Sequence, residues 1–144
     1  MTLQNFNPKV AASLAKWHAM VENKNLEDIA SIIHADATFR SPMAFKPYHS
    51  AQAVMLLLRT VLTVFEDFAY HRQLATGDGL SVVLEFSARV GEKTLKGVDL
   101  IQFDADGLIT DFEVMIRPFN GLQALGAEMG ARLAHLLPAY KAGA

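Results

Sequence analysis

The chain has 144 residues, of which 51% are hydrophobic and 19% charged, with a formal net charge of −2 and no cysteine. These values predict one globular domain over residues 1–144 and exclude disulfides, thiolate metal sites and cysteine nucleophiles. Because basic residues form no run, neither nucleic acid nor a membrane surface is expected as a partner. The N-terminal sequence MTLQNFNPKV lacks a signal-peptide layout and no apolar run approaches the ~20 residues that span a bilayer, so we expect a cytoplasmic protein.

The first half of the chain is predicted to be mainly helical. Apolar residues recur at helical spacing from Pro8 to Val21 and predict a first helix with one apolar stripe. Asn25 is a suitable N-cap for a short second helix, whose apolar residues continue to Ile33.

A short strand and a loop separate these helices from a third. Residues 37–41 (ATFRS) read as a strand that Pro42 stops, and residues 42–50 form a loop with two prolines. Ser50 then caps a helix whose apolar face extends to Phe65.

After Phe68 the hydrophobic period changes to two, which is typical of strands. The turn sequences TGDG, GEK and DADG suit hairpins between successive strands. A helical pattern returns over residues 121–137. The four predicted strands cover residues 68–74, 80–90, 94–103 and 108–117.

Helices followed by an antiparallel meander are typical of an α+β domain. A curved antiparallel sheet wrapped around helices can enclose an internal pocket between the two layers. We expect a ligand to bind there.

One carboxylate lies in an otherwise nearly apolar strand, GVDLIQF, at residues 97–103. Asp99 shares a face with Ile101 and Phe103, but the intervening residues are also partly apolar, so alternation does not decide which face meets the helices. If Asp99 faces the helices, desolvation raises its pKa and leaves a protonated hydrogen-bond donor. A purely structural Asp, held by a backbone amide or by a hidden Arg or Tyr, is the alternative.

The last strand has one purely apolar face, formed by Phe112, Val114 and Ile116. This set is predicted to face the core and the pocket. The opposite face mixes charges with Met115 and suits a dimer contact. Further candidates to line or roof the pocket are Trp17, Met43, Phe45, Tyr48 and Phe86, with ordinary core packing as the alternative.

Two segments carry a resemblance to a known superfamily. Residues 16–54 (KWHAMVENKNLEDIASIIHADATFRSPMAFKPYHSAQAV) and 97–118 (GVDLIQFDADGLITDFEVMIRP) resemble the opening and the closing hairpin of the nuclear transport factor two, ketosteroid isomerase and SnoaL-like polyketide cyclase superfamily. The resemblance implies the cone fold over nearly the whole chain. For function it is less specific, because this fold hosts isomerases, cyclases, hydrolases and non-catalytic binders.

The resemblance carries over only some of the isomerase's site residues. Asp99 falls on the acid that stays protonated in ketosteroid isomerase and donates to the oxyanion. Arg40 and Ser41 fall where that enzyme has its base, and Trp17 falls on its oxyanion Tyr. The cyclases have a His and an acid where this chain has Asp99 and Val114, so neither catalytic set is complete.

The resemblance implies an enzyme acting without a cofactor or metal on a small apolar carbonyl compound, as an isomerase, cyclase or lyase. Asp99 would be the acid or hydrogen-bond donor, His71 the base (with Tyr48 or His49 as alternatives), and Ser41 a substrate-binding hydroxyl. A non-catalytic hydrophobic-ligand binder and a dimerisation domain are the alternatives. A homodimer is implied in either case.

Overall fold

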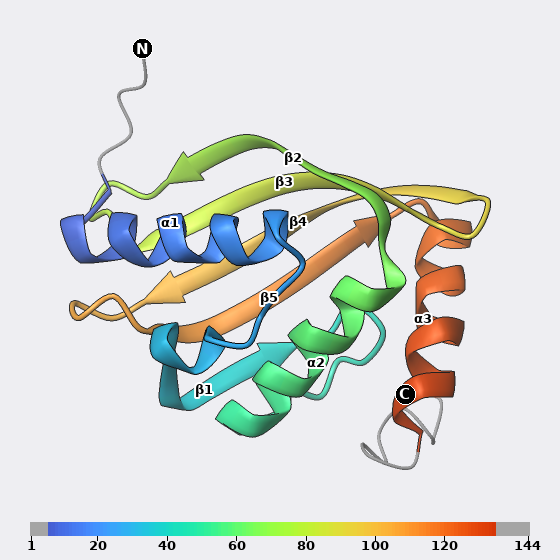
Figure 1. Cartoon of the computed structure of the whole chain (residues 1–144), viewed down its shortest axis with the longest axis horizontal. Coiled ribbons are helices and arrows are strands. Elements are labelled where there is room, and N and C mark those ends of the chain that lie inside the picture. The colour runs from blue at the N-terminus through green and yellow to red at the C-terminus, as the bar shows by residue number, and fades with distance from the viewer. Residues whose placement is uncertain (1–5, 135–144) are drawn as a thin grey trace.

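A computed structural model describes residues 6–134 as a sheet layer covered on one face by helices (Figure 1). The sheet has five strands in the order β1-β5-β4-β3-β2. The predicted α+β fold class is confirmed. The strands are β1 (Ile33–Arg40), β2 (Glu66–Ala75), β3 (Ser81–Val90), β4 (Lys93–Phe103) and β5 (Ile109–Arg117). The helices are α1 (Pro8–Glu22), the short 3-10 helix η1 (Ile29–Ile32), α2 (Ala51–Val64) and α3 (Phe119–Leu133).

The predicted first helix is α1, which lies along the sheet (Figure 1). Asn7 caps it: the Asn7 side chain accepts a hydrogen bond from the backbone N–H of Lys9 at 2.9 Å. Such a bond satisfies one of the donors that a helix N-terminus leaves unpaired. Val10 and Trp17 of the apolar stripe are buried, so the stripe faces the sheet.

The predicted second helix is shorter than expected. Only Ile29–Ile32 form a 3-10 turn, and Ile33 already belongs to β1, where it pairs with Ile109 of β5. The Asn25 side chain accepts from the backbone N–H of Glu27 and caps a turn before η1. Strand pairing with a distant part of the chain therefore overrides the local helical pattern.

The other two helices begin close to where the sequence predicts. The Ser50 side chain accepts from the backbone N–H of Ala53 at 3.0 Å and caps α2. In Figure 1, α3 stands at the end of the sheet where β5 finishes. The last predicted residues of this helix, 135–137, lie outside the described residues. None of the helices within residues 6–134 is both long enough and apolar enough to cross a membrane.

The strands β2 to β5 form the predicted antiparallel meander. The exception in the sheet is β1, which runs parallel to β5 at the edge. After β1 the chain passes through α2 to the opposite edge of the sheet, where β2 begins. The curved sheet is therefore mixed, with one parallel pair.

The structure decides which face of β4 meets the helices. Asp99 is 5% exposed, Ile101 1% and Phe103 2%, so this set faces inward. On β5 the apolar set also faces inward, as predicted: Phe112 is buried, whereas Met115 on the opposite face is 51% exposed.

Candidate functional site

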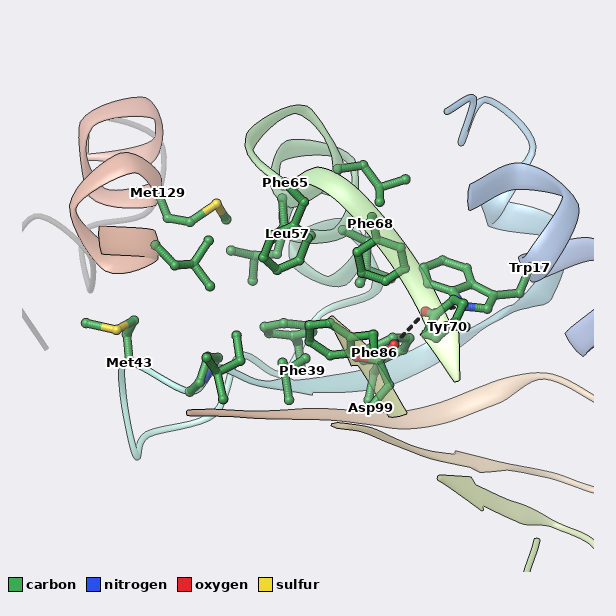
Figure 2. A pocket seen from close by; sticks show the side chains of 18 residues that line it. Trp17, Phe39, Met43, Leu57, Phe65, Phe68, Tyr70, Phe86, Asp99 and Met129 are labelled. Carbon is green, nitrogen blue, oxygen red and sulfur yellow. Dashed lines mark hydrogen bonds between the residues drawn. The ribbon is translucent and has the colours of Figure 1, made fainter. Parts of the chain in front are cut away.

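An apolar pocket lies between the sheet and the helices (Figure 2). The space between the lining side chains, with the open mouth included, is about 580 Å³. The cavity volume itself is only about 40 Å³. The pocket is therefore narrow. Its lining residues are Trp17, Phe39, Pro42, Met43, Leu57, Leu58, Val61, Leu62, Phe65, Phe68, Tyr70, Phe86, Asp99, Phe112, Val114, Ile116, Leu125 and Met129.

Only three of these side chains carry a nitrogen or an oxygen, and they are joined in one hydrogen-bonded chain. The indole N–H of Trp17 donates to the hydroxyl oxygen of Tyr70 at 2.9 Å. The Tyr70 hydroxyl donates to Oδ2 of Asp99 at 2.7 Å. In Figure 2 these three residues lie at one end of the pocket, and Met43 and Met129 lie at the other. The pocket thus has a polar end and an apolar end.

Burial changes the acidity of both titratable groups at the polar end. Desolvation raises the pKa of Asp99 to about 7, although the hydrogen bond from Tyr70 favours the ionised form. Desolvation and the neighbouring carboxyl of Asp99 raise the pKa of Tyr70 well above its ordinary value, so the phenol stays protonated. Near neutral pH Asp99 is present in both its acid and its carboxylate form.

Aromatic rings fix the positions of the polar side chains. The ring of Tyr70 meets that of Phe68 edge-on, with 4.8 Å between the ring centroids. Phe68 in turn stacks on Phe86 at 5.2 Å. Trp17 meets Phe112 of β5 edge-on at 5.5 Å. Since protein interiors pack densely, these contacts restrict how far the hydrogen-bonded groups can turn.

The structure brings seven of the predicted site residues to the pocket. Their functional roles stay predictions, but their side chains all lie in the lining. They are Trp17, Met43, Phe86, Asp99, Phe112, Val114 and Ile116.

Three other predicted residues, all near the loop after β1, are not part of the lining. Phe45 is 103% exposed. Tyr48 pairs through its backbone with Phe39 and packs against the core. Ser41 is buried, and its hydroxyl accepts from the backbone N–H of Met43 at 3.0 Å, which shapes the loop. In this loop Met43, rather than Phe45, lines the pocket.

The predicted base, His71, is not part of the pocket lining, and its role as the base stays a prediction. Its exposed imidazole is hydrogen-bonded to the Ser87 hydroxyl at 2.7 Å. His71 follows Tyr70 in β2, and successive strand residues point to opposite faces of a sheet. The alternative base His49 contacts the Thr38 hydroxyl and is exposed as well.

Arg40, which with Ser41 falls at the isomerase's base position in the resemblance, also faces away from the pocket. Arg40 forms an ion pair with Asp111 of β5, with 3.1 Å between Nη2 and Oδ2. Within the described residues, Asp99 and Tyr70 are the titratable groups of the pocket lining.

Sequence reasoning missed Tyr70, although a signal was present. The period of two in the predicted strand 68–74 places Phe68 and Tyr70 on one face. In the structure Tyr70 lies directly opposite Phe86, which was a predicted pocket residue. The hidden Tyr considered as a structural partner of Asp99 is this residue.

The chain is similar to several solved structures that have the same fold. A steroid delta-isomerase from Pseudomonas aeruginosa is 61% identical, with a TM-score of 0.90 over 92% of this chain and 96% of that one. An uncharacterised bacterial protein with a cystatin-like fold from Silicibacter pomeroyi is 34% identical, with a TM-score of 0.79 over 85% of each chain. The epoxide hydrolase/cyclase-like enzyme SalBIII is 17% identical at a TM-score of 0.64, over 79% of this chain and 94% of that one, and shares the fold alone.

No curated protein sequence matches the chain. The family model of the SnoaL-like domain matches residues 14–112, which include most of α1, the first strand, the Asp99 strand and most of the pocket. The chain therefore belongs to the SnoaL-like domain family.

Proposed function

We propose that the protein is a cofactor-independent isomerase of a small apolar carbonyl compound. Asp99 donates a hydrogen bond to the carbonyl oxygen as the enol forms, and a water molecule entering through the pocket mouth takes the proton from the α carbon and returns it to the γ carbon. The observation that carries this proposal is the buried carboxyl at the polar end of an otherwise apolar pocket. Its pKa of about 7 leaves the acid form populated at neutral pH. A donor held in a dry site stabilises developing negative charge far better than the same group in water.

The relative from Pseudomonas aeruginosa supports the reaction class, because it is a steroid delta-isomerase and 61% identical. The width of the pocket limits the substrate. With about 40 Å³ open to the centre of a water molecule, a large ring system enters only if the lining side chains spread. Met43 and Met129 are suited to such movement, since methionine has three rotatable bonds. A small cyclic ketone needs less displacement than a steroid.

The test is turnover of 3-cyclohexenone, whose conversion to the conjugated enone is followed by ultraviolet absorbance. We expect Asp99→Asn to lower kcat about 100-fold or more, the usual effect of removing a donor at a developing oxyanion. Asp111→Asn is the matched control, because it makes the same change on the outer face of the sheet. Equal rates for wild type and Asp99→Asn would contradict the proposal.

A second candidate is a non-catalytic binder of an apolar ligand. It is favoured by one observation: within the described residues, no carboxyl or imidazole besides Asp99 lines the pocket to accept a carbon-bound proton. In that case 4-fluorophenol, a mimic of an enol, binds to wild type more tightly than to Asp99→Asn, while cyclic ketones undergo no turnover.

We also propose that the protein is a cytoplasmic homodimer formed through the outer face of the sheet. Met115 is 51% exposed there and lies opposite Val98 of β4. An apolar side chain at the centre of a sheet face suits an interface core. Sedimentation should show a dimer for wild type and a monomer for Met115→Glu. A monomeric wild type would contradict this proposal.

A further inference from the structure

The hydrogen bonds at the polar end of the pocket have a fixed direction. An indole nitrogen can only donate, so Trp17 must be the donor in its 2.9 Å bond to the Tyr70 oxygen. The Tyr70 oxygen is thereby used as an acceptor, and its single proton is left to donate to Asp99 at 2.7 Å. The order of donation is therefore Trp17 to Tyr70 to Asp99.

As a result, the two carboxyl oxygens of Asp99 differ in their hydrogen bonds. Oδ2 accepts the Tyr70 proton. Oδ1 has no hydrogen-bond partner among residues 6–134, although the side chain lines the pocket. A proton on Oδ2 would compete with the Tyr70 proton for the same short contact, whereas a proton on Oδ1 meets no competing donor.

We propose that Trp17 and Tyr70 are positioning residues that form a one-way donor relay and keep the acidic proton of Asp99 on Oδ1, where a ligand can accept it. A carboxyl beside a hydroxyl that is free either to donate or to accept could carry its proton on either oxygen. Because Trp17 and Tyr70 donate in a fixed order to Oδ2, only Oδ1 is left to carry the proton. Its consequence for catalysis depends on the proposed role of Asp99 as a donor, but the arrangement itself does not.

Other ionisable groups lie near the relay, and their titration must be distinguished from that of Asp99. The ring of His18 on α1 meets that of Tyr70 edge-on at 5.1 Å, and its Nε2 is hydrogen-bonded to Gln73 of β2 at 2.7 Å. A second cleft, which His18 and Tyr70 also line, has Glu22, Lys24 and Asp67 among its lining residues. His18 is the closest of these groups to the relay, so the test is done in a His18→Gln background.

The relay can be measured without a substrate, because Trp17 is the single tryptophan of the chain. Its indole N–H gives one resonance in an NMR spectrum of the full-length protein. We expect this resonance to follow pH with the same midpoint as the carboxyl carbon of Asp99, close to 7. Asp99→Asn should abolish the dependence, since Tyr70 then donates to a group that does not titrate.

Removing the Tyr70 hydroxyl should uncouple the Trp17 indole from the titration of Asp99. In Tyr70→Phe, which removes only the hydroxyl, the indole resonance should no longer follow pH. The midpoint of Asp99 should move upward by about one pH unit, because the carboxylate loses a hydrogen bond that stabilises its charge. Trp17→Phe should move the same midpoint upward by less, because the Tyr70 hydroxyl is retained but is less polarised.

Three results would overturn the proposal. One is an indole titration that persists in Tyr70→Phe, and another is an Asp99 midpoint that neither variant changes. The third is a difference of a full pH unit between the midpoints of the indole and of the Asp99 carboxyl in the His18→Gln background with Trp17 and Tyr70 both intact. A protein without isomerase activity can still pass this test, and an active isomerase can fail it, so the relay and the proposed function are judged separately.

Discussion

The hydroxyl of Tyr70 and the carboxyl of Asp99 are joined at 2.7 Å although their strands are not neighbours in the sheet. β3 lies between β2 and β4, so the bond passes over it on the inner face. Tyr70 is long enough to span the gap, and its oxygen is satisfied at both ends by Trp17 and Asp99. A buried carboxyl without such a donor would be considerably more costly.

The stability of the protein should fall as pH rises from about 4 to about 7. Burial raises the folded-state pKa of Asp99 from 3.8 to about 7, so in this window the folded protein holds a proton that the unfolded chain has lost. Stability therefore decreases with pH there and levels off above the folded value. The full effect is roughly 4 kcal/mol. Chemical denaturation at several pH values measures it.

The control for this experiment is Asp99→Asn, which keeps the shape of the side chain and cannot ionise. Other groups titrate too: Arg72 and Lys96 lower the pKa of Glu85, so its contribution is lost as pH falls. The difference between wild type and variant isolates Asp99. The variant should be the more stable protein at pH 8, and equal pH profiles would contradict the buried-acid assignment.

Gly126 of α3 should control the width of the pocket at its apolar end. A Cβ built there would clash with Cε of Met43, the far end of a flexible side chain. Gly126→Ala should push Met43 toward the pocket and weaken the binding of cyclic ketones. Stability should change by less than about 1 kcal/mol, because alanine also favours the helix.

Gly130→Ala is the matched control on the same helix, since nothing lies within 4 Å of its Cβ position. It should stabilise the protein by up to about 1 kcal/mol and leave ligand binding unchanged. Calorimetric titration of both variants distinguishes the two effects. Equal affinities for Gly126→Ala and Gly130→Ala would show that Met43 does not limit the pocket.

Gly97 of β4 should tolerate no side chain. A Cβ there lies 2.5 Å from the backbone oxygen of Met115 and 2.6 Å from Cζ of Phe86. Because backbone cannot move aside easily, Gly97→Ala should cost roughly 1–3 kcal/mol of unfolding free energy. Gly77→Ala, where nothing lies within 4 Å, should be nearly neutral. Thermal unfolding of the pair tests this, and equal melting temperatures would contradict it.

His71→Ala should leave the isomerase rate and its pH profile unchanged, because the imidazole lies on the outer face beside Ser87. Tyr70→Phe, one residue earlier, should instead shift the pH profile upward together with the pKa of Asp99. Steady-state rates from pH 5 to 9 compare the two variants. A loss of activity in His71→Ala comparable to that in Asp99→Asn would instead support the histidine as the base.

Much of the fold could be predicted from periodicity and capping, because these signals are local. The apolar stripe of α1, the Ser50 cap of α2 and the four strands with their turns each depend on residues close in sequence. The parallel pairing of β1 with β5 could not be predicted in the same way, because no local pattern specifies a partner some 70 residues away. Ile33 was assigned to a helix for the same reason.

The chemistry of the site likewise depends partly on local sequence and partly on contacts between distant parts of the chain. The sequence by itself identified Asp99 as an acid among apolar neighbours and the inward apolar face of β5, because strand alternation and the cost of burying charge follow from residue type. It left open which way Asp99 faces and what supports it. Only the tertiary structure decided this, by bringing α1, β2 and β4 together so that Trp17 and Tyr70 donate in order to one carboxyl oxygen. Hydrogen-bond partners distant in sequence are fixed by packing, and packing is a property of the whole chain.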